Sequence, residues 1–319
     1  MSELNLHERS LALAPMDLAQ LDTLAPNWFT EACAQPLRSN WVAANGCQIH
    51  YLAWKSAAPN ADAAGIMFVH GGGAHANWWR FVAPFFTSLG PVVAIDLSGM
   101  GDSAWRDSYS ATIRADEIEA VMHDAGFYGP NRRAPYLVGH SFGGLTAMRH
   151  TALYGDAIGG FVIAEAPVRP PHVSRPKSMQ PINATTLREY ANYAEAIARF
   201  RLKPKQTCEH DFIIEHIAHH SIRATATGFT WKFDPSALTS ERHSEPFRDY
   251  LSAARCRTAL LFAEQSSLCT PEVVDYMATL QPASTPRVFL PHAQHHLMLD
   301  QPLAFVSAVR AILSNWSLA

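Results

Sequence analysis

The octapeptide "LVGHSFGG", residues 137–144, decides the fold prediction for this chain. An apolar run ends at Gly139, Ser141 follows, and glycine returns at Gly143. A serine on a tight turn between a strand and a helix needs neighbours without side chains, and such a turn exposes its hydroxyl at the helix N-terminus. A G-x-S-x-G pattern also occurs in ordinary glycine-rich turns. It predicts that Ser141 is a nucleophile because a strand pattern precedes it and a helix pattern follows it.

Apolar runs on both sides of Ser141 predict a parallel sheet. They occupy residues 65–70, 91–96, 135–139, 160–165, 258–264 and 287–291, and helical stretches begin near Asn77, Ala111, Phe142, Pro271 and Pro302. Nearly continuous apolar strands that alternate with helices are typical of a sheet covered on both faces. Asn45-Gly46 also predicts a β-hairpin before the first of these strands. The fold class is therefore α/β.

The alternation is interrupted between about Arg169 and Ser252, where prolines cluster and helical patterns follow with no strand between them. We interpret residues 169–252 as a helical cap, or lid, inserted into a core of residues 1–168 and 253–319. Residues 1–38 form an N-terminal helical arm in this interpretation. A cap over a sheet edge is where a ligand pocket is expected.

Composition argues against several classes of protein. The 319 residues are 48% hydrophobic and 17% charged, which suits a globular domain with a large core. A net charge of -3 without Lys or Arg clusters argues against nucleic acid and anionic membranes as partners. No apolar stretch approaches the ~20 residues that span a bilayer, and no signal-peptide pattern is present, so we expect a cytoplasmic protein. Five scattered cysteines without a CxxC pair indicate neither a disulfide framework nor a thiolate zinc site.

A glycine-rich turn follows the strand at residues 65–70, in "FVHGGGAHANWWRF" (68–81). Its backbone N–H groups can point at a bound oxygen. We expect the N–H of Gly72, together with that of Phe142, to form an oxyanion hole, with Gly73 as the alternative donor. A phosphate-binding turn is disfavoured because neither GxxxxGK[ST] nor GxGxxG with a following acid is present.

A histidine-rich loop, "RVFLPHAQHHLMLDQP" (287–302), follows the last predicted strand. A general base must be able to accept a proton near pH 7, which imidazole does. We select His295 as the base; His296 and His292 are neighbours that could be surface residues.

The landmarks "HGGG", "DLSGMGDS", "GHSFGG" and "PHAQHHLMLDQP" occur in the order seen in α/β-hydrolases, and the resemblance to that superfamily covers residues 39–316. It implies an α/β-hydrolase fold with an inserted cap, a Ser-acid-His triad in that chain order, and hydrolysis of a carboxylic ester or lactone without cofactor or metal. Carbon–carbon bond hydrolase, thioesterase and non-turning-over receptor remain alternatives on the same fold. Dehalogenase activity is not implied, because it requires an Asp nucleophile where this chain has Ser141.

Two carboxylates compete for the place of the triad acid. The superfamily's usual Asp follows the strand before the histidine loop, but in "LLFAEQSSLC" (260–269) Ser266 takes that position. A subset that includes haloalkane dehalogenases and zearalenone lactonase-like hydrolases carries the acid after the strand that follows the nucleophile helix. Glu165 in "FVIAEAPVRP" (161–170) resembles that arrangement and is our prediction, with Glu264 as the alternative.

Substrate contacts are predicted for an aromatic and histidine set around the pocket: Trp78, Trp79, His140, Phe200 and Trp231. His216 and His220 have i, i+4 spacing on a helix, which can hold a metal, but without HExxH we interpret them as a polar helix face or a contact between cap and core. The expected partner is a small-molecule ester or lactone. Oligomeric state is not predicted, and a homodimer is one of the open alternatives.

Overall fold

Eight strands form one sheet in the computed structural model, which describes residues 25–57, 60, 62–174, 187–238 and 245–318. Their order across the sheet is β1-β2-β4-β3-β5-β6-β9-β10. β2 pairs antiparallel with β1 and β4, and the remaining pairs are parallel, which confirms the α/β prediction. The strands are β1 (Arg38–Ala44), β2 (Cys47–Trp54), β3 (Ile66–Val69), β4 (Val92–Ile95), β5 (Tyr136–His140), β6 (Gly160–Ala164), β9 (Thr258–Ala263) and β10 (Arg287–Leu290).

The predicted hairpin joins β1 to β2. Ala44 pairs with Cys47, so Asn45 and Gly46 form a two-residue loop. Both have positive φ, at 48° and 75°, a region that Asn and Gly adopt more readily than other residues. The hairpin prediction is therefore confirmed, and the backbone preferences of Asn45 and Gly46 explain the turn.

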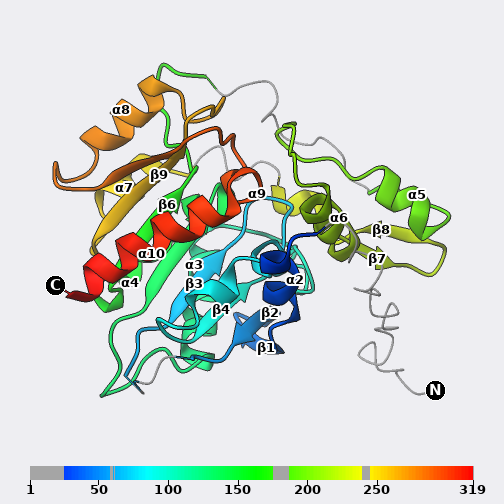
Figure 1. The fold of residues 1–319 in the computed structure, drawn as a ribbon, viewed down its shortest axis with the longest axis horizontal. Helices are drawn as coiled ribbons and strands as arrows, with labels where there is room; N and C mark the ends of the chain where they lie inside the picture. Colours follow the sequence, from blue (N-terminus) through cyan, green and yellow to red (C-terminus); the bar gives the residue numbers. More distant parts are fainter. Residues whose placement is uncertain (1–24, 58–59, 61, 175–186, 239–244, 319) are drawn as a thin grey trace.

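Alternating side chains divide the core into two apolar layers, one on each face of the sheet. On β3, Ile66 and Phe68 face the layer that contains α10 (Pro302–Leu318), whereas Met67 and Val69 face the opposite layer. Successive strand residues point to opposite faces, so a fully apolar strand needs cover on both. Figure 1 shows α10 crossing the sheet. The first layer also contains α2 (Asn27–Ala34), and the second contains α3 (Ala111–Asp124), α4 (Phe142–Tyr154) and α8 (Pro271–Thr279).

The helix predicted from about Asn77 is wrong in type. The segment forms two 3₁₀ turns, η2 (Ala76–Trp79) and η3 (Ala83–Phe86). Pro84 lies at the start of the second turn and has no N–H for an α-helical hydrogen bond. The other helix starts agree with the predictions.

The inserted segment contains strands as well as helices. After α5 (Tyr193–Ala198) and α6 (Asp211–His220), β7 (Ile222–Ala224) and β8 (Phe229–Trp231) form an antiparallel hairpin that the helical description missed. Figure 1 shows these four elements gathered at one end of the molecule, away from α8. The segment ends with η6 (Pro235–Leu238) and α7 (Phe247–Ser252), and α7 packs against α4 of the core. The proposed boundaries at 169 and 252 stay a prediction.

The predicted N-terminal arm falls mostly outside the described residues, which begin at 25. Within them α2 is helical and β1 begins at Arg38. The remaining short elements are η4 (Gly155–Ala157) and α9 (Leu297–Asp300). Among the described residues, no helix is both long and apolar enough to cross a bilayer.

Candidate active site

Ser141 lies on a strained turn between β5 and α4. Its φ is 52° and its ψ is -119°, a combination unusual for a residue with a side chain. The turn is close to other backbone: a Cβ on Gly143 would lie 2.3 Å from the carbonyl oxygen of His70, and one on Gly144 would lie 2.5 Å from the Cβ of Ala166. The glycines after Ser141 are therefore needed for close packing of this turn.

His295 contacts both Ser141 and Glu165. Its Nε2 lies 2.9 Å from Ser141 Oγ, and its Nδ1 lies 3.2 Å from Glu165 Oε2. An ionised carboxylate only accepts hydrogen bonds, so Nδ1 carries the hydrogen and Nε2 is free to accept one from the serine hydroxyl. His295 is 3% exposed and Glu165 is fully buried, so water competes little for these contacts.

The carboxylate of Glu165 is fixed by two further donors. The N–H of Ala263 donates to Oε1 at 2.9 Å, and the Ser266 hydroxyl donates to Oε2 at 2.7 Å. Ser266 in turn accepts hydrogen bonds from the N–H groups of Leu268 and Cys269. Ser266 stands where an Asp is usual in the superfamily, but its contact with Glu165 was not predicted from the sequence. Its position in the chain, where the acid usually lies, was the available signal.

The competing carboxylate, Glu264, has a different partner. Its Oε2 accepts from the N–H of His292 at 2.9 Å. The structure thus brings Glu165 to the ring of His295, whereas Glu264 holds the backbone at the start of the histidine loop.

The glycine turn after β3 lies against the nucleophile, since a Cβ on Gly71 would be 3.5 Å from the Cβ of Ser141. Nδ1 of His70 donates to the Gly71 carbonyl at 2.7 Å, and its Nε2 accepts from the N–H of Leu97 at 3.1 Å. In a planar trans peptide the Gly72 N–H points opposite to that carbonyl. His70 therefore orients the predicted oxyanion donor, a role that sequence reasoning missed although His70 directly precedes the glycines.

The two other predicted donors differ in their surroundings. Gly73, the alternative, already donates its N–H to the sulfur of Met100 at 3.4 Å, which favours Gly72. Phe142 is the first residue of α4, where backbone N–H groups and the helix dipole favour a developing negative charge.

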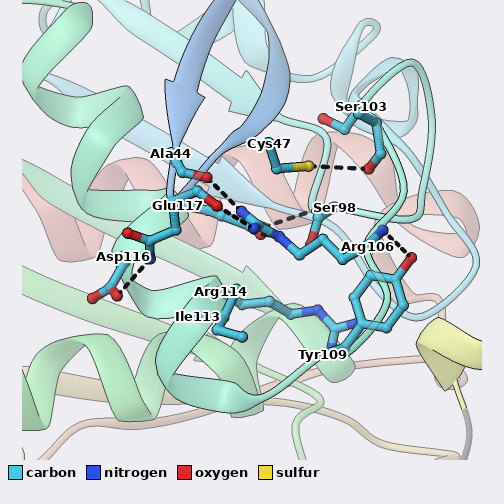
Figure 2. A network of polar contacts seen from close by, with 12 residues as sticks. Ala44, Cys47, Ser98, Ser103, Arg106, Tyr109, Ile113, Arg114, Asp116 and Glu117 are labelled. Carbon is cyan, nitrogen blue, oxygen red and sulfur yellow. Dashed lines mark hydrogen bonds and ion pairs between the residues drawn. The ribbon is translucent and has the colours of Figure 1, made fainter.

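A polar network stabilises the loop that carries Met100. Buried Glu117 of α3 accepts from the N–H of Ser98 and from Nε of Arg106, both at 2.9 Å, and Figure 2 shows its carboxylate between these two donors. Arg106 also donates to the carbonyl of Ala44 at 2.6 Å. The network ties the loop after β4 to α3 and to the β1–β2 hairpin.

The predicted substrate-contact residues separate into three groups. Trp78 packs edge-on against His296, the residue after His295, with ring centroids 5.2 Å apart. Trp79 is fully buried between Phe68 and Phe305, so it is a core residue, contrary to our expectation. Its ring belongs to the apolar layer on the α10 face of the sheet. Phe200 and Trp231 contact each other within the inserted segment, with ring centroids 6.2 Å apart.

His140 is buried beneath the histidine loop. Its Nε2 donates to the carbonyl oxygen of His295 at 3.0 Å, so His140 supports the loop that carries the predicted base. Burial, aided by the charge of His295, lowers the pKa of His140 well below its usual value. The ring is therefore neutral near pH 7.

Two groups of described residues have the spacing of metal ligands. One consists of His140, His295 and His296, and the other of His50, Asp96 and Asp102. The helical pair His216 and His220 belongs to neither; His216 Nε2 donates to the carbonyl of Asn77 at 3.3 Å.

Comparison with known proteins agrees with the fold. Residues 66–309 match the model of the alpha/beta hydrolase family. The chain is 25% identical over 276 residues to a Mycobacterium tuberculosis protein named esterase Rv0045c, covering 84% of this chain and 87% of that one. Two solved structures superpose with TM-scores of 0.72 and 0.71, an E-2-(acetamidomethylene)succinate hydrolase and a thioesterase domain from the curacin biosynthetic pathway. Their identities are 16% and 20%; they cover 88% and 87% of this chain and all of theirs, and they support the fold alone.

Proposed function

The chain belongs to the alpha/beta hydrolase family, and we propose that this hydrolase cleaves carboxylic esters, lactones included, through a covalent acyl-enzyme on Ser141. The observation that carries the proposal is the continuous hydrogen-bonded line from Ser141 through His295 to Glu165. The esterase name of the M. tuberculosis relative supports an ester as substrate.

In the proposed reaction, Ser141 Oγ attacks the acyl carbon while His295 Nε2 accepts its proton. The oxyanion that forms accepts hydrogen bonds from the N–H groups of Gly72 and Phe142. His295 then protonates the leaving alkoxide. In the second half of the reaction a water molecule gives a proton to His295 and attacks the acyl-enzyme, and Ser141 Oγ leaves with that proton as the acid is released. Glu165 keeps the imidazole in the required tautomer and balances the imidazolium charge. Acidification should lower the rate, because a protonated His295 cannot accept the serine proton.

The test is active-site labelling together with turnover. Wild-type protein is incubated with a fluorophosphonate probe, and the labelled peptide is identified by mass spectrometry. Hydrolysis of short p-nitrophenyl esters, a thioester and a simple lactone is then measured with and without the probe. We expect one label, on Ser141, and loss of ester turnover in proportion to labelling.

Other outcomes separate the alternatives. Faster turnover of the thioester than of its oxygen counterpart favours a thioesterase. Labelling without turnover of any substrate favours a receptor that retained the pocket. Hydrolysis that survives full labelling of Ser141 refutes the proposed mechanism.

A further inference from the structure

A stretch of the inserted segment, residues 232–238, lies on the loop that follows β4. The N–H of Gly101 donates to the carbonyl of Lys232 at 2.8 Å, and the N–H of Asp234 donates to the carbonyl of Gly99 at 2.7 Å. These two hydrogen bonds join backbone to backbone, so they hold the stretch whatever its side chains are. The inserted segment is therefore attached to the loop that carries Met100, beside the glycine turn.

Two core side chains hold the same stretch. The hydroxyl of Tyr109 donates to Oδ2 of Asp234 at 2.7 Å, and Nη2 of Arg114 donates to the carbonyl of Ala237 at 2.9 Å. The Arg114 guanidinium also lies 4.9 Å from the ring centre of Tyr109 and 4.7 Å from that of Phe142, and Figure 2 shows it beside the Tyr109 ring. Arg114 is only 3% exposed, so water competes little for these contacts. They fix the stretch relative to the start of α4.

Leu238 ends the stretch and lies against the glycine turn. Its Cδ1 is 3.5 Å from the position that a Cβ on Gly73 would occupy, which is van der Waals contact. A methylene group therefore cannot pass between Leu238 and Gly73. Leu238 also packs on the apolar layer that contains Met100 and Phe142. Its side chain bounds the site next to Gly72, the predicted oxyanion donor.

The order of the strands indicates which half of a bound ester meets Leu238. β5, which leads to Ser141, has β3 and β4 on one side and β6, β9 and β10 on the other. His295 reaches the serine from the loop after β10, so the alkoxy oxygen that it protonates lies toward that side. The acyl group points away from the alkoxy group, toward the loop after β4. It therefore meets Leu238.

We propose that Leu238 is the specificity-determining residue on the acyl side, and that this hydrolase acts on esters of short-chain acids. The inference names the substrate class of the proposed ester hydrolysis and rests on it. A long acyl chain would have to displace Leu238 from Gly73 against the contacts that hold the stretch. Tyr109 and Arg114 are positioning residues, because they act on substrate only through the stretch that ends at Leu238.

The experiment compares an acyl series with an alcohol series on the full chain. p-Nitrophenyl acetate, butyrate and octanoate keep the leaving group constant while the acyl group grows. Ethyl and hexyl acetate keep the acyl group constant and are followed by proton release. kcat/KM is measured for wild type, Leu238→Ala and Leu238→Phe, each checked by thermal melting. Leu303→Ala is the matched control, because Leu303 is 43% exposed and lies on α10.

We expect wild-type protein to have a kcat/KM for the acetate at least about tenfold higher than for the octanoate. Leu238→Ala should raise the octanoate-to-acetate ratio by about tenfold or more, because it removes the side chain that blocks the longer chain. Leu238→Phe should lower the butyrate-to-acetate ratio. The hexyl-to-ethyl acetate ratio should stay within about twofold of wild type in both variants. Leu303→Ala should match wild type in both series.

Tyr109→Phe tests the positioning role. It keeps the ring beside Arg114 and removes the hydroxyl that holds Asp234. The octanoate-to-acetate ratio should rise, by less than in Leu238→Ala. A merely structural role would lower the rates of all esters by one factor and leave the ratio unchanged, which would refute the positioning role.

Failure of this inference differs from failure of the proposed function. Ester turnover with an acyl ratio that neither Leu238 variant changes overturns the role of Leu238. An equal change in the alcohol ratio overturns its place on the acyl side, and a wild-type preference for octanoate overturns the short-chain class. If no ester is turned over and the fluorophosphonate probe does not label Ser141, the hydrolytic mechanism itself is wrong.

Discussion

The array of Ser141, His295 and Glu165 has a counterpart near the opposite edge of the sheet. There, Ser39 Oγ lies 2.7 Å from His50 Nε2, and His50 Nδ1 lies 2.7 Å from Asp96 Oδ2. Both contacts are shorter than the 2.9 Å and 3.2 Å of the first array. Residue types and hydrogen-bond order therefore do not distinguish the two.

The surroundings do distinguish them. Ser39 is exposed in a regular edge strand, whereas Ser141 lies on a positive-φ turn beside a glycine loop and the start of a helix. Asp96 also accepts the N–H groups of Ala76 and Asp102, so its carboxylate fixes two loops. We therefore interpret the array around His50 as structural and the array around His295 as the proposed catalytic site.

The pKa of His50 also argues against a catalytic role for its array. Burial lowers the pKa of His50, but the hydrogen bond and charge of Asp96 outweigh it, and the net shift is upward. A raised pKa keeps His50 protonated over a wider range, which makes it a poorer base near neutral pH. The raised pKa of His50 is thus a second reason to interpret its array as structural.

The largest difference in activity should be between substitutions of the two serines, Ser141 and Ser39. Ser141→Ala should lower kcat/KM for a p-nitrophenyl ester by about 10⁴-fold or more, because covalent catalysis is lost. Ser39→Ala should stay within about twofold of wild type, given its exposed position. Steady-state kinetics on folded proteins checks both, and an active Ser141→Ala variant would reverse our assignment of the two arrays.

The next largest difference in activity should be between substitutions of the two glutamates, Glu165 and Glu264. Glu165→Gln should lower kcat/KM by roughly 10²- to 10⁴-fold, since an amide supports the wrong tautomer and cannot balance the imidazolium; the upper figure is the serine-protease precedent. Glu264→Gln, which changes a contact to the His292 backbone, should cost less than about tenfold. The same ester assay compares them. Equal losses, or a larger loss for Glu264→Gln, would contradict the choice of Glu165.

Asp96→Asn should affect stability more than catalysis. It removes a buried charge that His50 and two backbone N–H groups share, and breaking such a set costs about 3–5 kcal/mol. Urea unfolding measures the loss, with Asp102→Asn as the more exposed control. In the folded variant, kcat/KM should fall less than in Glu165→Gln. A stable but inactive Asp96→Asn protein would mean that the array around His50 takes part in catalysis.

The smallest effect concerns stability between pH 7.5 and 6.5. Burial lowers the pKa values of six histidines below the unfolded value of about 6.5, so the unfolded chain binds more protons and stability is lost as pH falls. The raised pKa of His50 acts oppositely, adding stability as pH falls, for a net loss of roughly 1–2 kcal/mol. The six are His70, His75, His140, His216, His220 and His296.

Urea unfolding at several pH values tests this balance through two variants. His50→Gln should make the loss on acidification steeper, because it removes the opposing group. His216→Gln should make the loss shallower, because it removes one of the six histidines with a lowered pKa. Slopes are compared rather than absolute stabilities, so the general cost of each substitution cancels. Identical slopes in both variants would contradict the assigned pKa directions.

Sequence alone determined the features that depend on neighbouring residues. The apolar strands and intervening helices specified an α/β sheet because burial on both faces requires that pattern. Asn45-Gly46 specified a hairpin through its backbone preferences, and the glycines around Ser141 specified its turn. The family resemblance added the roles expected of His295 and of an acid.

Tertiary structure decided what depends on residues far apart in the chain. Glu165 rather than Glu264 reaches His295 across 130 positions, and His50 reaches Asp96 across 46. The buried setting of Trp79 and the meeting of His140 with His296 likewise arise from packing. Periodicity gives the face on which a side chain lies, but a hydrogen bond requires its partner within about 3 Å and at a suitable angle. Only the folded chain sets that distance.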